Sequence, residues 1–586
     1  MDNLRKRSVV NTYEMGDMPS SSGKAQHAFT ATTSELSSED KPFDHKRLSV
    51  LAAEDRRVSI ATIEAARVTE IDDRNGQFHR SFTPRQVHII SLGSNIGSGV
   101  FIGTGKALAN GGPGNMVIAY GLACSCVWAV LQTLSEMTIA FPTSGNYIDY
   151  AYRWVDPALA FGAGFAEWLG WTAIVAAEAA FFNILVGFWT EGTGFPAAAG
   201  LTLFTVASLA IFTMPNTVFA WFEYITSLVK IFLFLIIIFV SFAIVGGAGA
   251  NGRLDGSYWR ELPVFKNGFG GFSNCILLAV WAVGDQVFIG IMGGEAQSPR
   301  FSMAHATKLV PFRVNIVYML SVILITLMVP SDDERLLGGG GVAASPFVVA
   351  FTDAKIPGLP HIINAGMIIG ILGISAEAIY LASRILRSMS HHQLLPERFA
   401  QVDNKGRPRW ALAITCGVAV VLTYMNLSAG GAIALNWLVS ITSACFFANW
   451  MIIAFTSWRF HQCLKAQGDN LFGEPFAWTS VKWPLAPAWL FSVSTLMFIC
   501  CFAAGLKPLG GASISAENFF EYMIGIIIIV GFTGAFKLIM KTQWRDPETA
   551  DLVTGRRTLS EEELHQLREY YAQPAWKRFG TYAQLW

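Results

Sequence analysis

Charged residues are scarce in this chain. Only 14% of its 586 residues are Asp, Glu, Lys or Arg, whereas soluble domains carry about 25%. Hydrophobic residues make up 52%, and the mean hydropathy is +0.42. This balance excludes an ordinary soluble protein and indicates an integral membrane protein.

Net charge is lacking too, because 42 basic and 42 acidic residues cancel. A protein that binds nucleic acid normally carries a basic excess, so we expect no nucleic-acid partner. The eight cysteines lie almost all in apolar stretches without paired spacing, which favours small packing residues over a metal site or a disulfide framework. No catalytic or phosphate-loop motif occurs, and we expect no enzyme activity, no metal and no cofactor.

Both ends of the chain are polar. Residues 1–85 contain no apolar core of a cleaved signal and predict a disordered cytoplasmic tail. Residues 546–586 form a second cytoplasmic tail. Within it, Ser560 and Glu563 have the spacing of a capping box, which predicts a short amphipathic helix over about 561–572.

Between the tails lies an all-α membrane domain, expected over 86–545. Apolar stretches of about 18 residues or more indicate membrane-crossing helices. There are twelve: 88–109, 114–139, 158–190, 197–214, 218–248, 272–294, 309–329, 359–388, 409–426, 432–458, 483–505 and 518–541. Lys and Arg gather before the first span and in the 6–7 and 8–9 connections, which predicts that both termini are cytoplasmic.

Glycine interrupts the first span. Residues 91–113 hold five glycines between positions 93 and 105, and each glycine lowers helix stability. One interpretation is a helix break that turns backbone N–H groups toward a ligand such as a carboxylate. Gly97 and Gly99 would then allow close backbone approach, and Ser98 would add a hydroxyl. The other is that small residues let two helices pack closely.

The sixth span is irregular as well. Asp285 and Gln286 lie where burying polar side chains is costly, and Gly290 follows them. Irregularity in the first and sixth spans is typical of transporters built from two five-helix repeats. Trp281, just before the irregular segment, is either an aromatic lid over a substrate or a core residue.

Several ionisable residues fall inside predicted spans. Glu178 lies in the third span, and Glu377 follows Ser375 in the eighth. Glu223 and Lys230 lie seven residues apart in the fifth span, on roughly one helix face. A lysine near the middle of the membrane must find a partner or lose its proton. Two interpretations therefore stand side by side: a protonation site coupled to transport, and a static ion pair that holds the bundle together.

Three sequence blocks match a known family. They are the first-span block ending GKALANGGP, then LSEMTIAFPTSGNYIDYAYRWVDPALAFGAGF (134–165), and GEAQSPR (294–300). The chain resembles fungal amino acid permeases, the yeast-type branch of the amino acid–polyamine–organocation superfamily. The resemblance implies the leucine-transporter-like fold, in which spans 1–5 are repeated with inverted topology by spans 6–10 and two peripheral helices follow. It also implies proton-driven amino acid import across the plasma membrane.

The same resemblance implies where the substrate binds. The carboxylate is expected at the first-span break, the α-amino group at the sixth-span break, and an aromatic gate at Trp281. The expected substrate-binding residues are Ile96, Gly97, Ser98, Gly99, Trp281, Val283, Gly284 and Asp285; the expected proton-coupling residues are Lys230, Glu178, Glu223 and Ser375. Ser375 and its neighbours are expected to face the same pocket.

The chain also departs from the family pattern. Asp285 stands where relatives commonly have glycine, and Val287 where they have glutamate. We hypothesise that Asp285 supplies a negative charge for the amine or cationic side chain of the substrate. Two alternatives remain: a polyamine, choline or 4-aminobutyrate permease, and a nutrient-sensing receptor with a permease fold. The expected partners are an amino acid or related amine, protons, the lipid bilayer and trafficking machinery that acts on the tails.

Overall fold

A computed structural model describes residues 82–578 except Asn95, Ser98, 191–192, 285–286, 297–298, 338–344, 357 and 511–513. The predicted N-terminal tail lies outside the described residues almost entirely. Apart from an isolated backbone bridge between Phe82 and Ala296, the described residues form helices and the turns and loops between them.

The helices of the first half of the chain are α4 (Pro84–Gly93), the π-helical turn η1 (Gly99–Gly103), α5 (Thr104–Ala140), α6 (Tyr147–Trp154), α7 (Pro157–Thr190), α8 (Ala197–Ala210), η2 (Ile211–Thr213) and α9 (Asn216–Val245). Those of the second half are α10 (Ser257–Glu261), α11 (Gly268–Val283), α12 (Val287–Glu295), α13 (Pro299–Met328), η3 (Glu334–Leu337), α14 (Pro346–Asp353), α15 (Leu359–His391), η5 (Glu397–Ala400), α16 (Arg409–Met425), α17 (Ala429–Gln467), η6 (Leu471–Gly473), α18 (Leu485–Leu506), α19 (Ala516–Met540) and α20 (Glu561–Ala572).

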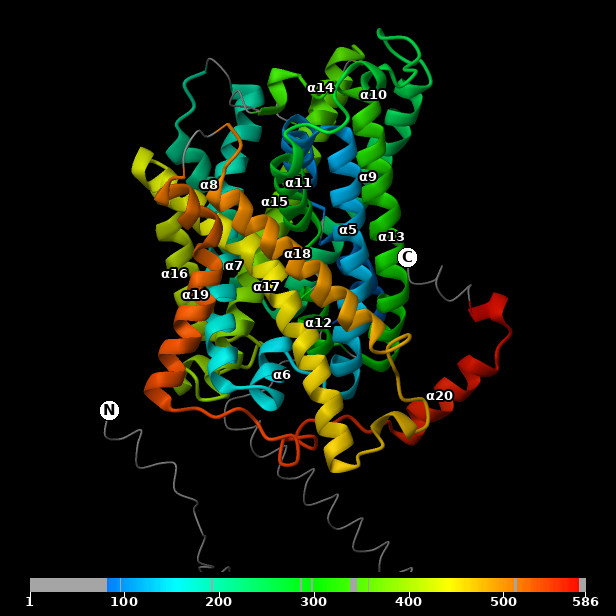
Figure 1. The fold of residues 1–586 in the computed structure, drawn as a ribbon, viewed down its shortest axis with the longest axis vertical. Helices are drawn as coiled ribbons and strands as arrows, with labels where there is room; N and C mark the ends of the chain where they lie inside the picture. Colours follow the sequence, from blue (N-terminus) through cyan, green and yellow to red (C-terminus); the bar gives the residue numbers. More distant parts are fainter. Residues whose placement is uncertain are drawn as a thin grey trace, which may run out of the picture. The chain divides into compact units, whose positions relative to one another are not determined.

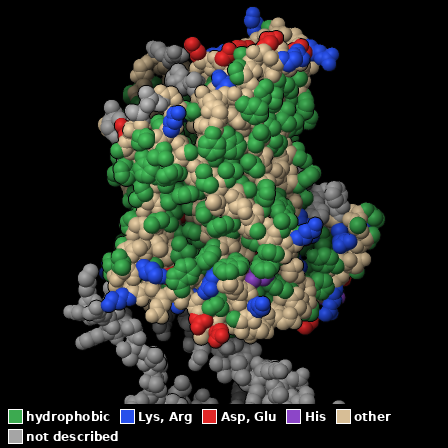
Figure 2. Space-filling view, viewed as in Figure 1, with side chains coloured by type: hydrophobic (Ala, Val, Ile, Leu, Met, Phe, Trp, Pro, Cys, Tyr) green, Lys and Arg blue, Asp and Glu red, His purple; other side chains and the backbone are tan. Residues whose placement is uncertain are grey.

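The long helices suit a membrane. Among the described residues, eight helical segments are long and apolar enough to cross one, and α8 with η2 and α16 are shorter apolar helices. Each of the twelve predicted ranges contains helix, with interruptions in the first and the sixth, and the number of membrane crossings stays a prediction. Hydrophobic side chains cover the middle of the visible face in Figure 2, and charged side chains gather mainly at its two ends. Phe232 and Phe239 on α9 are more than 60% exposed, as expected for a lipid-facing surface. The chain is a multi-pass membrane protein.

The first predicted span is broken. Pro84 starts α4 behind a capping box, in which Gln86 N–H bonds the Thr83 hydroxyl and Thr83 N–H bonds the Gln86 amide oxygen. The helix stops at Gly93, and the chain is helical again only from Gly99. Helix α5 follows η1 and extends into the second predicted span through a kink at Gly112. The φ angle of Gly112 is +77°, a value that glycine adopts without steric cost and other residues rarely adopt.

Helices from the two halves pack against each other. α5 lies along α11 and α13, and α7 lies along α15 (Figure 1). Tyr318 on α13 donates its hydroxyl hydrogen to the backbone oxygen of Ala282, 2.9 Å away, and so holds the end of α11. These contacts position the two irregular segments described below.

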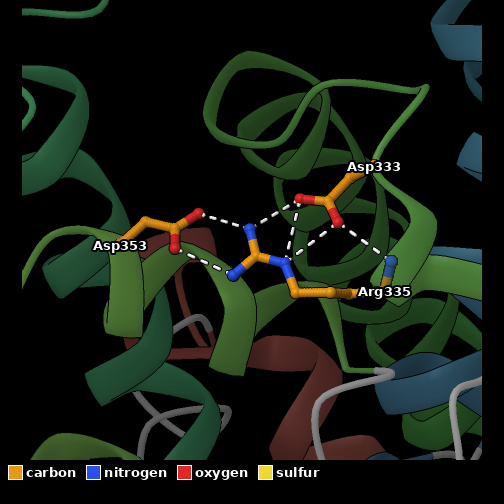
Figure 3. A network of polar contacts seen from close by, with 3 residues as sticks. All are labelled: Asp333, Arg335 and Asp353. Carbon is orange, nitrogen blue, oxygen red and sulfur yellow. Dashed lines mark hydrogen bonds and ion pairs between the residues drawn. The ribbon is translucent and has the colours of Figure 1, made fainter.

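An ion-pair network orders one end of the bundle. Arg335 lies between Asp333 and Asp353, with Nη2 2.6 Å and 2.7 Å from their carboxylate oxygens (Figure 3). It joins η3 to the end of α14. The Arg335 hydrogen bonds hold the pKa of the Asp333 carboxyl below its usual value. Asp333, Arg335 and Asp353 all lie between the seventh and eighth predicted spans.

At the opposite end, the C-terminal segment is docked against the bundle. Trp154 Nε1 donates to the backbone oxygen of Asp551, 3.0 Å away, and Arg557 N–H donates to the backbone oxygen of Ala140 at 2.9 Å. The predicted tail helix is present as α20, with the capping box between Ser560 and Glu563. The tail is therefore an ordered part of the structure at least as far as Arg578.

Candidate functional site

Two broken helices meet near the middle of the bundle. The first break lies between Gly93 and Gly99, and the second lies between Val283, where α11 ends, and Val287, where α12 begins. They are in contact: a Cβ atom added to Gly99 would lie 2.7 Å from Ala282 Cα. Close packing and a helix break, the two interpretations of this glycine-rich segment, therefore both hold at Gly99.

Beside this contact is a cavity of about 50 Å³. It is lined by Ser94, Gly97, Gly99, Trp171, Ile174, Glu178, Trp281, Ala282, Ile374, Glu377 and Phe446. The cavity thus brings together Gly97, Gly99, Trp281 and Glu178, which come from three separate predicted spans. Its volume is below the roughly 300–1,000 Å³ of typical ligand pockets, so a bound amino acid requires the surrounding helices to move apart.

Aromatic side chains form one wall of the cavity. Trp281 is half-buried and lies with its ring centroid 6.4 Å from that of Phe181 on α7. Trp171 and Phe446 are buried, with ring centroids 5.7 Å apart. The sequence did not single out Trp171 or Phe446, because nothing local distinguishes them from core residues. Phe446 also explains Gly284, since a Cβ atom there would lie 2.5 Å from the Phe446 ring.

Two acidic side chains from different helices line the same cavity. Glu178 on α7 is 3% exposed and Glu377 on α15 is 1% exposed. The sequence places Glu377 inside the eighth predicted span but does not assign it to the expected site. Ser375, which is also expected to face the pocket, donates its hydroxyl hydrogen to the Ser208 hydroxyl on α8 at 3.1 Å, and its part in the site stays a prediction. Residues 374 and 377 share a helix face, whereas 375 is rotated by about 100° from 374.

Lys230 and Glu223 form a buried ion pair on α9. The Lys230 Nζ and Glu223 Oε1 atoms are 3.5 Å apart, and both side chains are at most 1% exposed. Gly373 on α15 leaves room for the lysine, since a Cβ atom there would lie 3.3 Å from Nζ. Ser227, between Glu223 and Lys230 in the sequence, contacts Gly93 at the end of α4. The pair therefore contacts the helix that leads into the first break.

The remaining expected residues fall into two groups. Ile96 and Val283 are buried beside the breaks. Ser98 and Asp285 lie outside the described residues, so the contribution of their side chains stays a prediction.

A second buried ionic cluster lies between the cavity and the end of the bundle on which the C-terminal tail is docked. Arg384 Nε donates to Glu295 Oε1 at 3.0 Å, and Asn216 Nδ2 donates to Glu295 Oε2 at 2.7 Å. Arg384 Nη2 donates to Asn216 Oδ1 at 2.9 Å, which closes the ring of contacts. The Arg384 guanidinium also stacks over Tyr380, 3.7 Å from the ring centroid. The cluster joins the first turn of α9, the end of α12 and α15. Glu295 belongs to the GEAQSPR block, but its partners could not be inferred from sequence.

Comparisons with known proteins identify the family of this chain. The family model described as amino acid permease matches residues 86–547. The amino-acid permease GAP3 of Candida albicans is 30% identical over 525 residues, which cover 87% of this chain and 86% of the relative. The general amino-acid permease GAP1 of Saccharomyces cerevisiae is 30% identical over 518 residues, 85% of this chain and 84% of the relative. The histidine permease of the same yeast is 30% identical over 558 residues, 92% and 90% of the two chains. This chain therefore belongs to the amino acid permease family, a family of membrane transporters and not of enzymes.

Proposed function

We propose that this protein is a secondary active transporter that imports amino acids together with protons across the plasma membrane. The observation that carries the proposal is the cavity at the contact of the two broken helices. Broken helices near the bilayer midplane present backbone groups and helix ends to the substrate and the coupling ion. The resemblance of the whole domain to amino-acid permeases supports the same substrate class.

The proposed architecture has twelve crossings in a membrane domain over 86–545, with spans 1–5 and 6–10 as inverted repeats. Helix pairing supports it, because α5 packs on α13 and α7 packs on α15, which are the second and third spans of each repeat. The N-terminal and C-terminal tails are both placed in the cytoplasm, because Lys and Arg gather in the segments predicted on that face.

In the proposed mechanism, the substrate carboxylate meets the N-terminal end of the helix that starts at Gly99. Such an end carries partial positive charge. The Val100 and Phe101 N–H groups at this end donate to the Gly97 backbone oxygen in the structure, so they would have to exchange that acceptor for the carboxylate. The α-amino group meets the break after Val283, and Trp281 covers the substrate. Lys230 binds and releases a proton during the cycle. Its ion pair with Glu223 breaks and forms again as the helices around the first break rearrange.

The test is uptake of a panel of labelled amino acids in a transport-deficient host, with external pH varied. We expect accumulation that rises as external pH falls and collapses with a protonophore. Uptake that requires sodium and ignores pH would overturn the proton assignment. A protein that binds amino acids but accumulates none would instead be the nutrient-sensing receptor.

A second candidate substrate class is a cationic amino acid or a related amine. Glu178 and Glu377 both line the cavity, and no Lys or Arg is among the described residues that line it. Two carboxylates in one small buried space are stabilised by a proton or by a cation. Including lysine, arginine, 4-aminobutyrate and a polyamine in the panel decides between the two classes.

A further inference from the structure

A second cavity lies away from the transport site, between α13 and the C-terminal segment. It has a volume of about 180 Å³. Its lining residues are Ala304, His305 and Lys308 on α13, and Tyr570, Tyr571, Ala575 and Arg578 of the C-terminal segment. Figure 1 shows that α20 and the turn after it rise beside the lower part of the bundle instead of staying beneath it.

Specific contacts hold the walls of this cavity in place. The backbone oxygen of Phe301, 2.7 Å from His305 Nδ1, can only accept a hydrogen bond, so Nδ1 carries the hydrogen. Nε2 lies 2.9 Å from the Tyr570 hydroxyl oxygen, within hydrogen-bond distance. The Phe301 and Tyr570 rings also meet edge to face, 5.7 Å apart. His305 thus connects α13 to the tail through both of its ring nitrogens.

The charged groups of the cavity are both positive. Lys308 and Arg578 line it from opposite walls, and no Asp or Glu is among its described lining residues. Arg578 Nε is buried and has no hydrogen-bond partner among the residues that the structure describes. A buried N–H donor of this kind is stabilised by an anionic acceptor. Phosphate suits the pair, because arginine offers a planar set of donors and lysine a compact charge.

The surroundings place the cavity at a lipid boundary. Phe312 lies one helical turn beyond Lys308 on the same face of α13 and is 65% exposed. Trp576, two residues before Arg578, is 71% exposed. Exposed aromatic residues beside Lys and Arg are typical of the membrane–water interface, and basic pockets at membrane helices bind lipid head groups.

We propose that this cavity is a phosphate-binding site whose ligand is the phosphate of an anionic membrane lipid. The bound phosphate bridges Lys308 in the membrane domain and Arg578 in the tail, and so strengthens the contact between the tail and α13 where such lipids are present. A soluble phosphate compound has the same recognition chemistry. The proposal does not depend on which substrate is transported.

The test uses the purified full-length protein. Native mass spectrometry counts bound phosphatidylinositol 4-phosphate against phosphatidylcholine, and a parallel titration uses inorganic phosphate. We expect selective binding of the anionic lipid, weakened about fivefold by each of Lys308→Gln and Arg578→Gln. Lys577→Gln is the matched control, because Lys577 has the same charge but does not line the cavity.

The outcomes separate the alternatives. Equal weakening by Lys577→Gln, or equal binding of phosphatidylcholine, would overturn the site. If inorganic phosphate binds with the same dependence on Lys308 and Arg578 while the lipid does not, the lipid source is overturned and the phosphate site stands. Unchanged unfolding temperatures of all three variants in phosphatidylcholine show that the folded state is intact.

Discussion

Arg384 and Glu295, 89 residues apart in the chain, form an ion pair that is at most 1% exposed, with Nε 3.0 Å from Oε1. Arg384 follows Glu377 by two helical turns, about 10 Å along α15, so the pair closes the bundle on the tail side of the cavity. In the proposed transport mechanism, a substrate released toward the tail leaves the cavity on the side of this contact. We therefore expect the pair to open and close during each transport cycle.

Removing one partner should be costly. Glu295→Ala leaves the Arg384 charge buried and uncompensated, and we expect a loss of about 3–5 kcal/mol of folding free energy. The measurement is thermal unfolding of the purified protein. Arg335→Gln is the control, because Arg335 is 42% exposed and such pairs contribute about 0–1 kcal/mol. Equal effects of the two substitutions would contradict a buried closing contact.

The contact of the two breaks depends on Gly99. Gly99→Ala places a methyl group 2.7 Å from the Ala282 backbone, and overpacking of this kind costs about 1–3 kcal/mol. We expect uptake to fall about tenfold or more while the protein still reaches the membrane. Gly187→Ala is the matched control, since a Cβ atom there meets no atom within 4 Å.

Lys230 is expected to couple protons to transport. In Lys230→Met, substrate exchange should persist while the rise of uptake at low external pH disappears. A purely static role predicts another result: Lys230→Met destabilises the protein by leaving Glu223 unpaired, and Lys230→Met with Glu223→Gln restores both stability and pH-dependent uptake. Lys465→Met, at an exposed position of α17, should behave like the wild type.

Glu377 is expected to select for positive charge in the substrate. A hydrogen bond to a charged group contributes about 1.5–3 kcal/mol, so Glu377→Gln should weaken uptake of a cationic substrate about 10-fold to 100-fold. Uptake of neutral amino acids should change much less. The measurement is competition between labelled alanine and unlabelled lysine or arginine, with the exposed Glu397→Gln as control. An unchanged preference would assign Glu377 to the structure of the cavity alone.

Asp149, in the first turn of α6, predicts a pH effect on stability. Burial raises the pKa of the Asp149 carboxyl, but the charge of His392 and hydrogen bonds from His392, Ser388 and Thr143 outweigh burial and lower it below the usual value. A lowered pKa in the folded state stabilises the protein above the unfolded-state pKa of about 3.9, and the contribution is lost as pH falls below that value.

Asp149→Asn should therefore lower the unfolding temperature near neutral pH, and the difference from the wild type should shrink below about pH 4. Thermal unfolding between pH 3 and pH 7 measures it. Asp255→Asn changes a carboxyl that is 65% exposed, and we expect little effect at any pH. A difference for Asp149→Asn that grows on acidification would contradict the assigned direction.

Sequence alone determined the membrane class, the helical ranges, the break at Gly97–Gly99, the irregular sixth span and the capped tail helix. These features are local, because they depend on hydropathy, on glycine and on capping residues that lie within one or two helical turns. The family blocks are contiguous as well, and the family assignment follows from them.

Only the tertiary structure decided which helix faces meet. It turned Ser375 toward α8, placed Glu377 and Phe446 at the cavity, and paired Glu295 with Arg384 across 89 residues. In a span that is hydrophobic almost all round, periodicity does not show which face is buried, so contacts between distant spans cannot be inferred. The docking of the tail on α13 could not be inferred for the same reason. Nothing in the local sequence around His305 or Tyr570 indicates that the fold brings the two side chains together.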